Sequence, residues 1–381
     1  MRCEYFAAGL CASCTVIETP YPDQIAHKQE RVAGLLAPLA PDLTWLPARA
    51  SAEQGFRTKA KMVIAGTVDA PTIGILAADG TGQDLRDCPL YPAALAQAFP
   101  VLAEFVTVAK LEPYSVPRRT GELKNVLVSV APDGALMVRW VMRSTEALAR
   151  IRKHLPWLQD QLPTLAVASL NVLAEHKAVV EGEREIVLTE RETLTMSVNG
   201  FDLHLRPQSF FQTNTDVAAA LYRQASAWIA NARPASLWDL YCGVGGFALH
   251  AAAPGRAVTG VEVSEQAIVS AQRTRDERLA EGDQAMADVE FITGDAVGWA
   301  SSRADAPEGI VVNPPRRGLG ESLSRWLDAS GARTIVYSSC NPDTLARDLG
   351  WMPNYRAEQA RLFDMFPHTG HGEVAVVLTR P

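Results

Sequence analysis

The stretch 236–251, SLWDLYCGVGGFALHA, decides the fold, because it reads as a strand, a glycine-rich turn and the beginning of a helix. Gly243, Gly245 and Gly246 allow the backbone to turn tightly and to approach a ligand closely. Further strands are expected in RAVTGVEV, VEFIT, GIVVN, RTIVYSS and EVAVVLT, with a helix over 264–282 after the first of them. Strands alternating with helices predict a Rossmann-like α/β domain with a mostly parallel sheet, in which ligands bind beyond the carboxyl ends of the strands.

The residues before this region predict an α+β domain. Its expected elements are an amphipathic helix over 22–40, helices at 92–110 and 145–162, and strands in KMVIAGTV, PTIGIL, NVLVSVAPDGALMVRWVMR and REIVLT. Asp133 and Gly134 suit the turn of a β-hairpin. We therefore expect three parts: 1–90, a cysteine-bearing segment with the start of the central domain; 91–200, the central α+β domain; and 201–381, the Rossmann-like domain.

The composition is that of an ordinary globular protein, with 48% hydrophobic and 21% charged residues in a chain of 381. No run of about 18 apolar residues and no signal-peptide core is present, so we expect a cytoplasmic protein without a membrane span. No pattern indicates an obligate protein partner. The formal net charge of −7 disfavours a uniformly basic surface, but basic residues cluster locally. The clusters are Arg57, Lys59 and Lys61; Arg118, Arg119 and Lys124; and Arg316 and Arg317.

The glycine-rich turn and the end of the next strand help to distinguish a dinucleotide from other nucleoside-containing cofactors. Glu262 closes the next strand, where a carboxylate can accept hydrogen bonds from both ribose hydroxyls. The run G-V-G-G-F-A lacks the G-x-G-x-x-G spacing that presents amides to a pyrophosphate, which disfavours a dinucleotide oxidoreductase. A D-x-x-x-G-x-G turn followed by an acidic strand end is typical of S-adenosylmethionine methyltransferases. Asp295, after the third strand, is expected near the adenine.

Two motifs at later strand ends suggest different methyl acceptors. Asn313-Pro314-Pro315 is found in enzymes that methylate exocyclic amines of bases, although those usually carry an aromatic residue where this chain has Arg316. Cys340 follows the strand RTIVYSS, and Pro342 suits the first turn of a helix. A cysteine at a helix N-terminus tends to have a depressed pKa, and so more thiolate. Amine methylation needs no such thiol.

A thiolate is what methylation of carbon 5 of uracil requires, because that carbon is a poor nucleophile. Addition of the thiolate to carbon 6 makes carbon 5 able to attack a methyl sulfonium. A base must then remove the carbon-5 proton before the cysteine can leave, and Glu373 is the candidate. His371 is the rival base, for which a structural role is expected.

The motifs QSFFQTN, DLYCGVGGF, NPPRRG, YSSCNP and LFDMFPHTGHGEV resemble the RNA (uracil-C5)-methyltransferases over nearly the whole chain. The resemblance implies S-adenosylmethionine contacts at Gln212, Tyr241, Glu262 and Asn313, with Cys340 as nucleophile and Glu373 as proton acceptor. The rival classes are an RNA amine methyltransferase built on the Asn-Pro-Pro motif and a non-enzymatic iron–sulfur RNA-binding protein.

The N-terminal cysteines resemble those of the ribosomal-RNA branch of the family. Cys3, Cys11 and Cys14, with the distant Cys88, resemble the set that holds a [4Fe–4S] cluster, although four thiolates could equally hold zinc. The chain begins at Cys3 with no room for the small β-barrel domain of many ribosomal members, and has Asn313 where some have Asp. Both features resemble the short branch acting on 23S ribosomal RNA at uracil 747. The tRNA branch, the alternative, is expected to lack the cysteines.

The RNA must present an unpaired or flipped uracil, since a base inside a helix cannot reach a buried thiol. The stretch FRTKAKM and residues 118–124 are the expected phosphate contacts. Phe210, Phe211 and Phe363 are candidate stacking platforms, although a phenylalanine is more often a core residue. The cluster is expected to be structural or RNA-binding, because methyl transfer moves no net electrons. Cys242, in the glycine-rich turn, has no assigned role.

Overall fold

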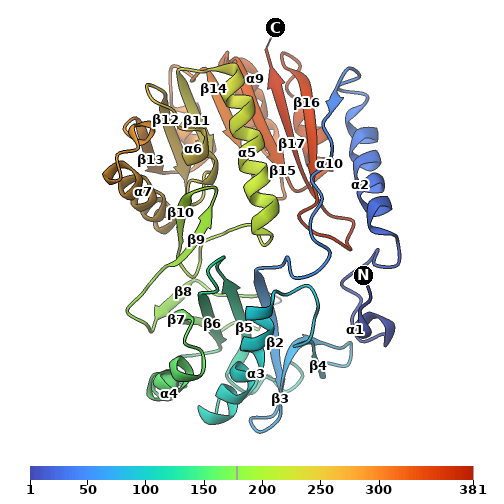
Figure 1. Ribbon diagram of the computed structural model, residues 1–381, viewed down its shortest axis with the longest axis vertical. Helices are drawn as coiled ribbons and strands as arrows, with labels where there is room; N and C mark the ends of the chain where they lie inside the picture. The colour runs from blue at the N-terminus through green and yellow to red at the C-terminus, as the bar shows by residue number, and fades with distance from the viewer. Residues whose placement is uncertain (177–178, 381) are drawn as a thin grey trace. The chain divides into compact units, whose positions relative to one another are not determined.

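The computed structural model describes residues 1–176 and 179–380, and its contacts divide the chain into two compact units (Figure 1). Unit 1 consists of Met1–Ser13, Glu53–Met196 and Arg206–Gln208. Unit 2 consists of Cys14–Ala52, Ser197–Leu205 and Ser209–Pro381. The expected boundary between residues 90 and 91 therefore falls inside one unit, and residues 14–52 belong with the C-terminal part of the chain rather than with the cysteine-bearing segment.

Unit 1 is built on a seven-stranded sheet in the order β4-β3-β2-β5-β6-β7-β8, whose only parallel pair among the described strands is β6 with β7. Its strands are β2 (Lys59–Gly66), β3 (Pro71–Leu76), β4 (Gly82–Asp84), β5 (Leu123–Val130), β6 (Leu136–Met142), β7 (Leu165–Val172) and β8 (Arg184–Val187), and its helices are α1 (Glu4–Ala7), α3 (Ala93–Val108) and α4 (Leu148–Gln161). Strand β9 (Leu194–Val198) follows.

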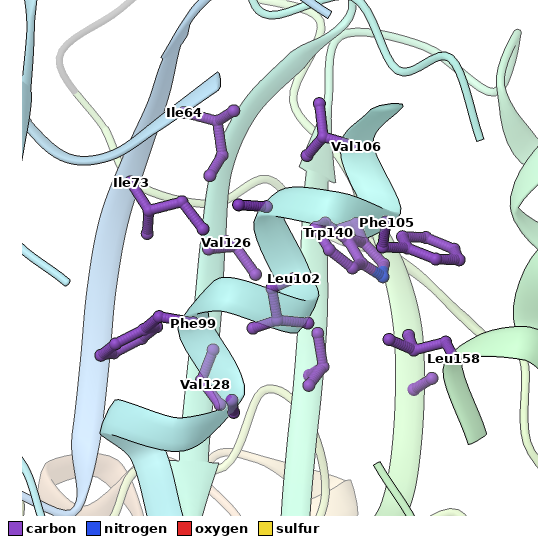
Figure 2. Packing of buried hydrophobic residues seen from close by; sticks show 14 of the residues in the cluster. Ile64, Ile73, Phe99, Leu102, Phe105, Val106, Val126, Val128, Trp140 and Leu158 are labelled. Carbon is purple, nitrogen blue, oxygen red and sulfur yellow. The ribbon is translucent and has the colours of Figure 1, made fainter. Parts of the chain in front are cut away.

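The core of unit 1 lies where α3 and α4 cover the sheet. Residues from both helices and from β2, β3, β5, β6 and β7 form one buried cluster, part of which Figure 2 shows. Phe105 stacks on Trp140 with ring centroids 5.1 Å apart. The expected hairpin is confirmed, since β5 and β6 pair antiparallel around Gly134, whose φ of 87° suits glycine. Apolar packing on this scale explains why the two amphipathic helices form.

Unit 2 contains the predicted α/β sheet, in the order β1-β16-β17-β15-β14-β11-β12-β13. Its strands are β1 (Thr44–Trp45), β11 (Ser236–Leu240), β12 (Ala257–Glu262), β13 (Val289–Thr293), β14 (Gly309–Val312), β15 (Thr334–Ser339), β16 (Arg356–Phe363) and β17 (Glu373–Thr379), with β10 (Phe201–Leu205) outside this sheet. Its helices are α2 (Tyr21–Leu36), α5 (Thr215–Ala232), α6 (Gly246–Ala251), α7 (Glu265–Ala280), α8 (Ala296–Ser301), α9 (Gly320–Ser330) and α10 (Pro342–Leu349), with a 3-10 turn at Gln284–Met286.

The sheet of unit 2 is mostly parallel, as the sequence predicted. Strand β17 is the exception, because it runs antiparallel to both β15 and β16. Strand β11 pairs with both β12 and β14, so the chain passes from one side of the sheet to the other after β13. At such a point the loops after neighbouring strands diverge and leave room for a ligand.

The N-terminal segment joins unit 2 through both sheet pairing and apolar packing. Thr44 and Trp45 of β1 pair parallel with Gln359 and Ala360 of β16. Val32 and Leu36, on one face of α2, are buried in the core of unit 2. The sequence predicted this amphipathic helix but not its partner, which lies near the other end of the chain.

None of the helices in the described part of the chain combines the length and the apolar character needed to cross a lipid bilayer.

Candidate active site

The glycine-rich turn connects β11 to α6 through left-handed backbone. Tyr241, Gly243 and Gly245 have φ angles of 68°, 53° and 84°. A Cβ atom at Gly246 would lie 2.6 Å from the ring of Tyr222, so a side chain there would force that ring to move. The backbone of the turn therefore packs closely against Tyr222.

A cavity of about 70 Å³, which we call the turn cavity, lies against this turn. It is lined by Phe210, Phe211, Gln212, Tyr222, Tyr241, Cys242, Gly243, Val244, Gly246, Phe247 and Asn313. Three of the four residues expected to contact the cofactor, Gln212, Tyr241 and Asn313, thus share one cavity although they come from separate parts of the chain.

Glu262, the fourth expected contact, lies beside the turn at the end of β12. Its carboxylate accepts hydrogen bonds from the backbone amides of Gly243, at 3.2 Å, and Ser264, at 3.0 Å. Each carboxylate oxygen can accept a second bond, so the side chain retains acceptor capacity. Asp295 instead caps α8, accepting a 2.8 Å hydrogen bond from the amide of Gly298.

Cys340 follows β15 and lines a second cavity, of about 170 Å³, which we call the thiol cavity. The lining residues are Lys28, Arg31, Val32, Arg316, Cys340, Asn341, Pro342, Asp343, Leu362, Gly370, His371, Gly372 and Val374. Asn341 caps α10 by accepting a hydrogen bond from the amide of Asp343, and Pro342 is the first residue of that helix, as expected. The strand end thus presents the thiol to an accessible space.

The prediction of a depressed pKa at Cys340 is wrong. Burial raises the pKa of the Cys340 thiol above its ordinary value, the charge of Glu373 raises it further, and Arg316 opposes the shift. Cys340 precedes the N-cap residue of α10, and the cap side chain already binds an amide of the first turn. Desolvation and a neighbouring carboxylate therefore outweigh the helix dipole, and the resting thiol is protonated.

Glu373, the first residue of β17, is only 1% exposed. The Ser338 hydroxyl donates a hydrogen bond to its Oε1 atom. Burial raises the pKa of Glu373 to about 7, against the lowering effect of that hydrogen bond. Burial and Asp239 raise the pKa of Tyr222, which lines the turn cavity, and the charge of Glu373 adds to this shift. Glu373 therefore interacts with both the thiol and a residue of the turn cavity.

The two neighbouring histidines differ in burial. His371, the rival base for which a structural role is expected, is exposed and lines the thiol cavity. His368 is the buried one, and its backbone amide donates a 2.9 Å hydrogen bond to Gln24 of α2.

Helix α2 forms a wall of the thiol cavity, which the sequence did not predict. The Lys28 ammonium, buried with a 6% exposed side chain, lies 2.6 Å from the Asp364 carboxylate and 3.0 Å from the carbonyl of Phe366. The Tyr21 hydroxyl donates a 2.7 Å hydrogen bond to the other oxygen of Asp364. These bonds tie α2 to the segment that leads into Glu373. The charged Asp364 between apolar neighbours in LFDMFP was the available signal.

The expected aromatic platforms separate by exposure. Phe363 is fully buried and Phe211 is 6% exposed, so both are core residues and those two expectations are wrong. Phe210 is 73% exposed and lines the turn cavity, which leaves it available to a base.

The expected phosphate contacts of unit 1 are partly wrong. Lys124 is buried, and its ammonium donates a 2.6 Å hydrogen bond to the carbonyl of Glu175. Burial lowers the pKa of Lys59 to about 8. Arg118 and Arg119 are exposed and remain candidates.

The four N-terminal cysteines are divided between the units. Cys3, Cys11 and Cys88 belong to unit 1, and Cys14 is the first residue of unit 2. Burial raises the pKa of Cys88, and the charges of Cys3 and Cys11 raise it further, so each of these two thiols interacts electrostatically with Cys88. Within residues 1–176 and 179–380, no three or more His, Cys, Asp or Glu side chains are already arranged to hold a metal ion.

Comparison with known proteins agrees with this arrangement. The family model described as tRNA (Uracil-5-)-methyltransferase matches residues 152–291 and 302–381. The 23S rRNA (uracil(747)-C(5))-methyltransferase RlmC of Pectobacterium carotovorum is 47% identical over 381 residues, covering 100% of both chains. That of Halothiobacillus neapolitanus is 47% identical over 383 residues, again covering 100% of both. The structure of Pyrococcus abyssi tRNA (uracil-54, C5)-methyltransferase with S-adenosyl-L-homocysteine superimposes with a TM-score of 0.77 at 25% identity, covering 96% of this chain and 85% of that one. The chain therefore belongs to the tRNA (uracil-5-)-methyltransferase family.

Proposed function

We propose that the protein transfers a methyl group from S-adenosylmethionine to carbon 5 of a uracil in 23S ribosomal RNA, at position 747. The observation that carries the chemistry is that Cys340 and Glu373 lie at the same edge of the sheet, because Ser339 and Val374, their neighbours in β15 and β17, are paired. The full-length relatives named for this RNA position support the substrate. Acting on ribosomal RNA would place the protein in the cytoplasm.

Cys340 is the proposed nucleophile. Its thiolate adds to carbon 6 of the uracil, forming a carbon–sulfur bond and shifting electron density to carbon 5. S-adenosylmethionine supplies the methyl group that carbon 5 attacks and leaves as S-adenosylhomocysteine. Because the resting thiol is protonated, it must release its proton to water as the uracil enters, and the Arg316 guanidinium, which favours the thiolate, supports this step.

Glu373 is the proposed base for the second half of the reaction. It accepts the proton from carbon 5, the carbon–sulfur bond breaks, and the sulfur of Cys340 leaves with the bonding electrons. A carboxyl group with a pKa of about 7 is ionised in an appreciable fraction near neutral pH, yet is far more basic than an exposed glutamate. We therefore assign proton removal to Glu373 rather than to the exposed His371.

The cofactor is proposed to bind along the glycine-rich turn. Gln212, Tyr241 and Asn313 line the turn cavity, and Glu262 beside it has acceptor capacity for the ribose hydroxyls. Phe210, exposed at the same cavity, is proposed to stack on a base of the RNA.

The substrate assignment is tested with three RNAs and labelled S-adenosylmethionine: a 23S fragment containing uracil 747, the same fragment with cytosine at that position, and bulk tRNA. We expect 5-methyluridine in the first RNA alone, identified by mass spectrometry of nucleosides. Methylation of tRNA would contradict the ribosomal assignment. A methylated exocyclic amine would instead indicate chemistry built on Asn313-Pro314-Pro315.

We also propose that Cys3, Cys11, Cys14 and Cys88 hold a [4Fe–4S] cluster. Four thiolates are the usual donor set for such a cluster. The electrostatic interaction of Cys3 and Cys11 with Cys88 supports the proposal, because burial and this repulsion both raise the pKa of Cys88 and both penalties are relieved when the thiolates bind a cation. The cluster would stabilise the N-terminal segment, and none of the bonds made or broken in methyl transfer involves it.

Anaerobically purified protein is expected to contain about four iron and four sulfide ions per chain and to absorb in the visible range. Cys88→Ser should lose most of this iron and absorbance, whereas Cys340→Ala, which removes a thiol outside the set, should keep both. Zinc in place of iron, or full iron content in Cys88→Ser, would contradict the proposed cluster.

A further inference from the structure

Ser338 lies two residues before Cys340, on the strand that pairs with the strand of Glu373. In β15 and β17, Ser338 pairs with Ala375 and Ser339 with Val374, so the antiparallel register brings Ser338 next to the start of β17. The Ser338 hydroxyl donates to Oε1 of Glu373, and the two residues are 0% and 1% exposed. In the described part of the chain, this is the only hydrogen bond formed by the Glu373 carboxylate.

We propose that Ser338 is a positioning residue for proton removal: its hydroxyl holds Oε1 of Glu373, favours the ionised carboxylate, and leaves Oε2 to take the carbon-5 proton. This inference rests on the proposed function, because it concerns the base that completes that reaction. The sequence offered no signal for it, since a serine two positions before the nucleophile is otherwise an ordinary strand residue.

The hydrogen bond from Ser338 is important because the other neighbours of Glu373 do not stabilise its charged form. The titratable groups that interact with it are Tyr222 on α5 and the thiol of Cys340 after β15, and both are neutral in the resting protein. Its partner across β16 is the apolar Phe363. Among the described residues, no cation stabilises the carboxylate, so burial favours the neutral acid and Ser338 alone opposes it. A neutral acid cannot accept the proton from carbon 5.

Loss of the Ser338 hydroxyl is expected to raise the pKa of Glu373. Removing a donor to the charged form of a buried carboxyl raises its pKa. Adduct breakdown should slow as the pH falls and Glu373 becomes protonated. We expect the midpoint of this decrease near pH 7 in the wild type and about one pH unit higher without the Ser338 hydroxyl. At pH 7 the ionised fraction of Glu373 then drops from about one half to about one eleventh, so adduct breakdown falls roughly fivefold, and raising the pH restores it.

The experiment compares Ser338→Val with Ser338→Thr, which have nearly the same shape and differ in the hydroxyl. Breakdown of the methylated protein–RNA adduct is measured in single turnovers from pH 6 to 9. In Ser338→Val, the midpoint of the pH profile should move to higher pH, and adduct should accumulate at pH 7 but not at pH 9. Ser338→Thr should keep the wild-type midpoint. Affinity for S-adenosylmethionine should be unchanged in both. Ser324→Ala, which removes another fully buried hydroxyl that has no hydrogen-bond partner, should retain the wild-type profile.

Two results would overturn the role of Ser338. The first is an unchanged midpoint of the pH profile in Ser338→Val. The second is a loss of rate that is equal at every pH and is shared by Ser338→Thr. Failure of the proposed function would look different, since the wild-type protein would then form no methylated adduct at all. If the Val variant does not fold, Ser338→Ala provides the same comparison with the hydroxyl removed and no added volume.

Discussion

Cys340→Ala should lower methyl transfer to uracil by at least about four orders of magnitude, because the variant has no thiolate to activate carbon 5. The cofactor should still bind, since the residues of the turn cavity are untouched. Truncation of a partly buried cysteine to alanine removes one sulfur atom at the edge of a cavity, so the fold should survive. The loss would then be one of chemistry rather than of structure.

The measurement uses RNA containing 5-fluorouracil at the target position. Fluorine cannot leave as a proton does, so the wild-type protein should remain covalently attached to the methylated RNA on a denaturing gel. Cys340→Ala should give no such band while binding S-adenosylmethionine with wild-type affinity by calorimetry. A covalent complex that persists without Cys340 would refute the mechanism, and retained methylation would favour the amine chemistry of Asn313-Pro314-Pro315.

Glu373→Gln should have the opposite effect on the adduct, which should accumulate even on natural uracil. The substitution keeps the size of the side chain and an oxygen that can accept from Ser338, but it removes the base. Carbon 5 can still be methylated, whereas its proton has no acceptor and the carbon–sulfur bond cannot break. We expect multiple turnover to fall by about 10² to 10⁴-fold, the usual contribution of a positioned general base.

A denaturing gel of the variant with natural RNA and labelled S-adenosylmethionine measures this directly. We expect one methyl group per chain, trapped as a protein–RNA complex that the wild type releases. His371→Ala provides the comparison, because that side chain lines the same cavity and was the rival base. Accumulation in His371→Ala but not in Glu373→Gln would transfer the role of base to the histidine.

Local signals predicted the catalytic sheet well. The strand, glycine turn and helix of 236–251 lie within one short stretch, and the positive φ angles at Gly243 and Gly245 are a property of that stretch itself. The position of Cys340 followed from the end of a strand in a parallel sheet, and Glu373 lies at the same edge because it begins β17, which runs antiparallel to β15. Strand β16 was missed, because its sequence RAEQARLF has no β-branched residue and no apolar run that would signal a strand.

The electrostatics of the site were predicted less well, because they depend on tertiary packing. A helix N-terminus suggested a reactive thiolate at Cys340, but burial and Glu373 outweigh it. Lys124 appeared to be a surface cation until the fold buried it against a backbone carbonyl. The ion pair of Lys28 and Asp364 joins residues 336 positions apart, and no spacing rule reaches that far.

The ion pair of Lys28 and Asp364 also affects when unit 2 can complete its fold during synthesis. Lys28 leaves the ribosome 336 residues before Asp364 and the strand β17 that follows it. Domains fold as units during synthesis, so unit 2 cannot complete its core until β17 has emerged. We therefore expect the thiol cavity to be absent from nascent chains that have not yet reached β17. The reactive site is thus assembled late in synthesis, once the segment that carries Glu373 can join α2.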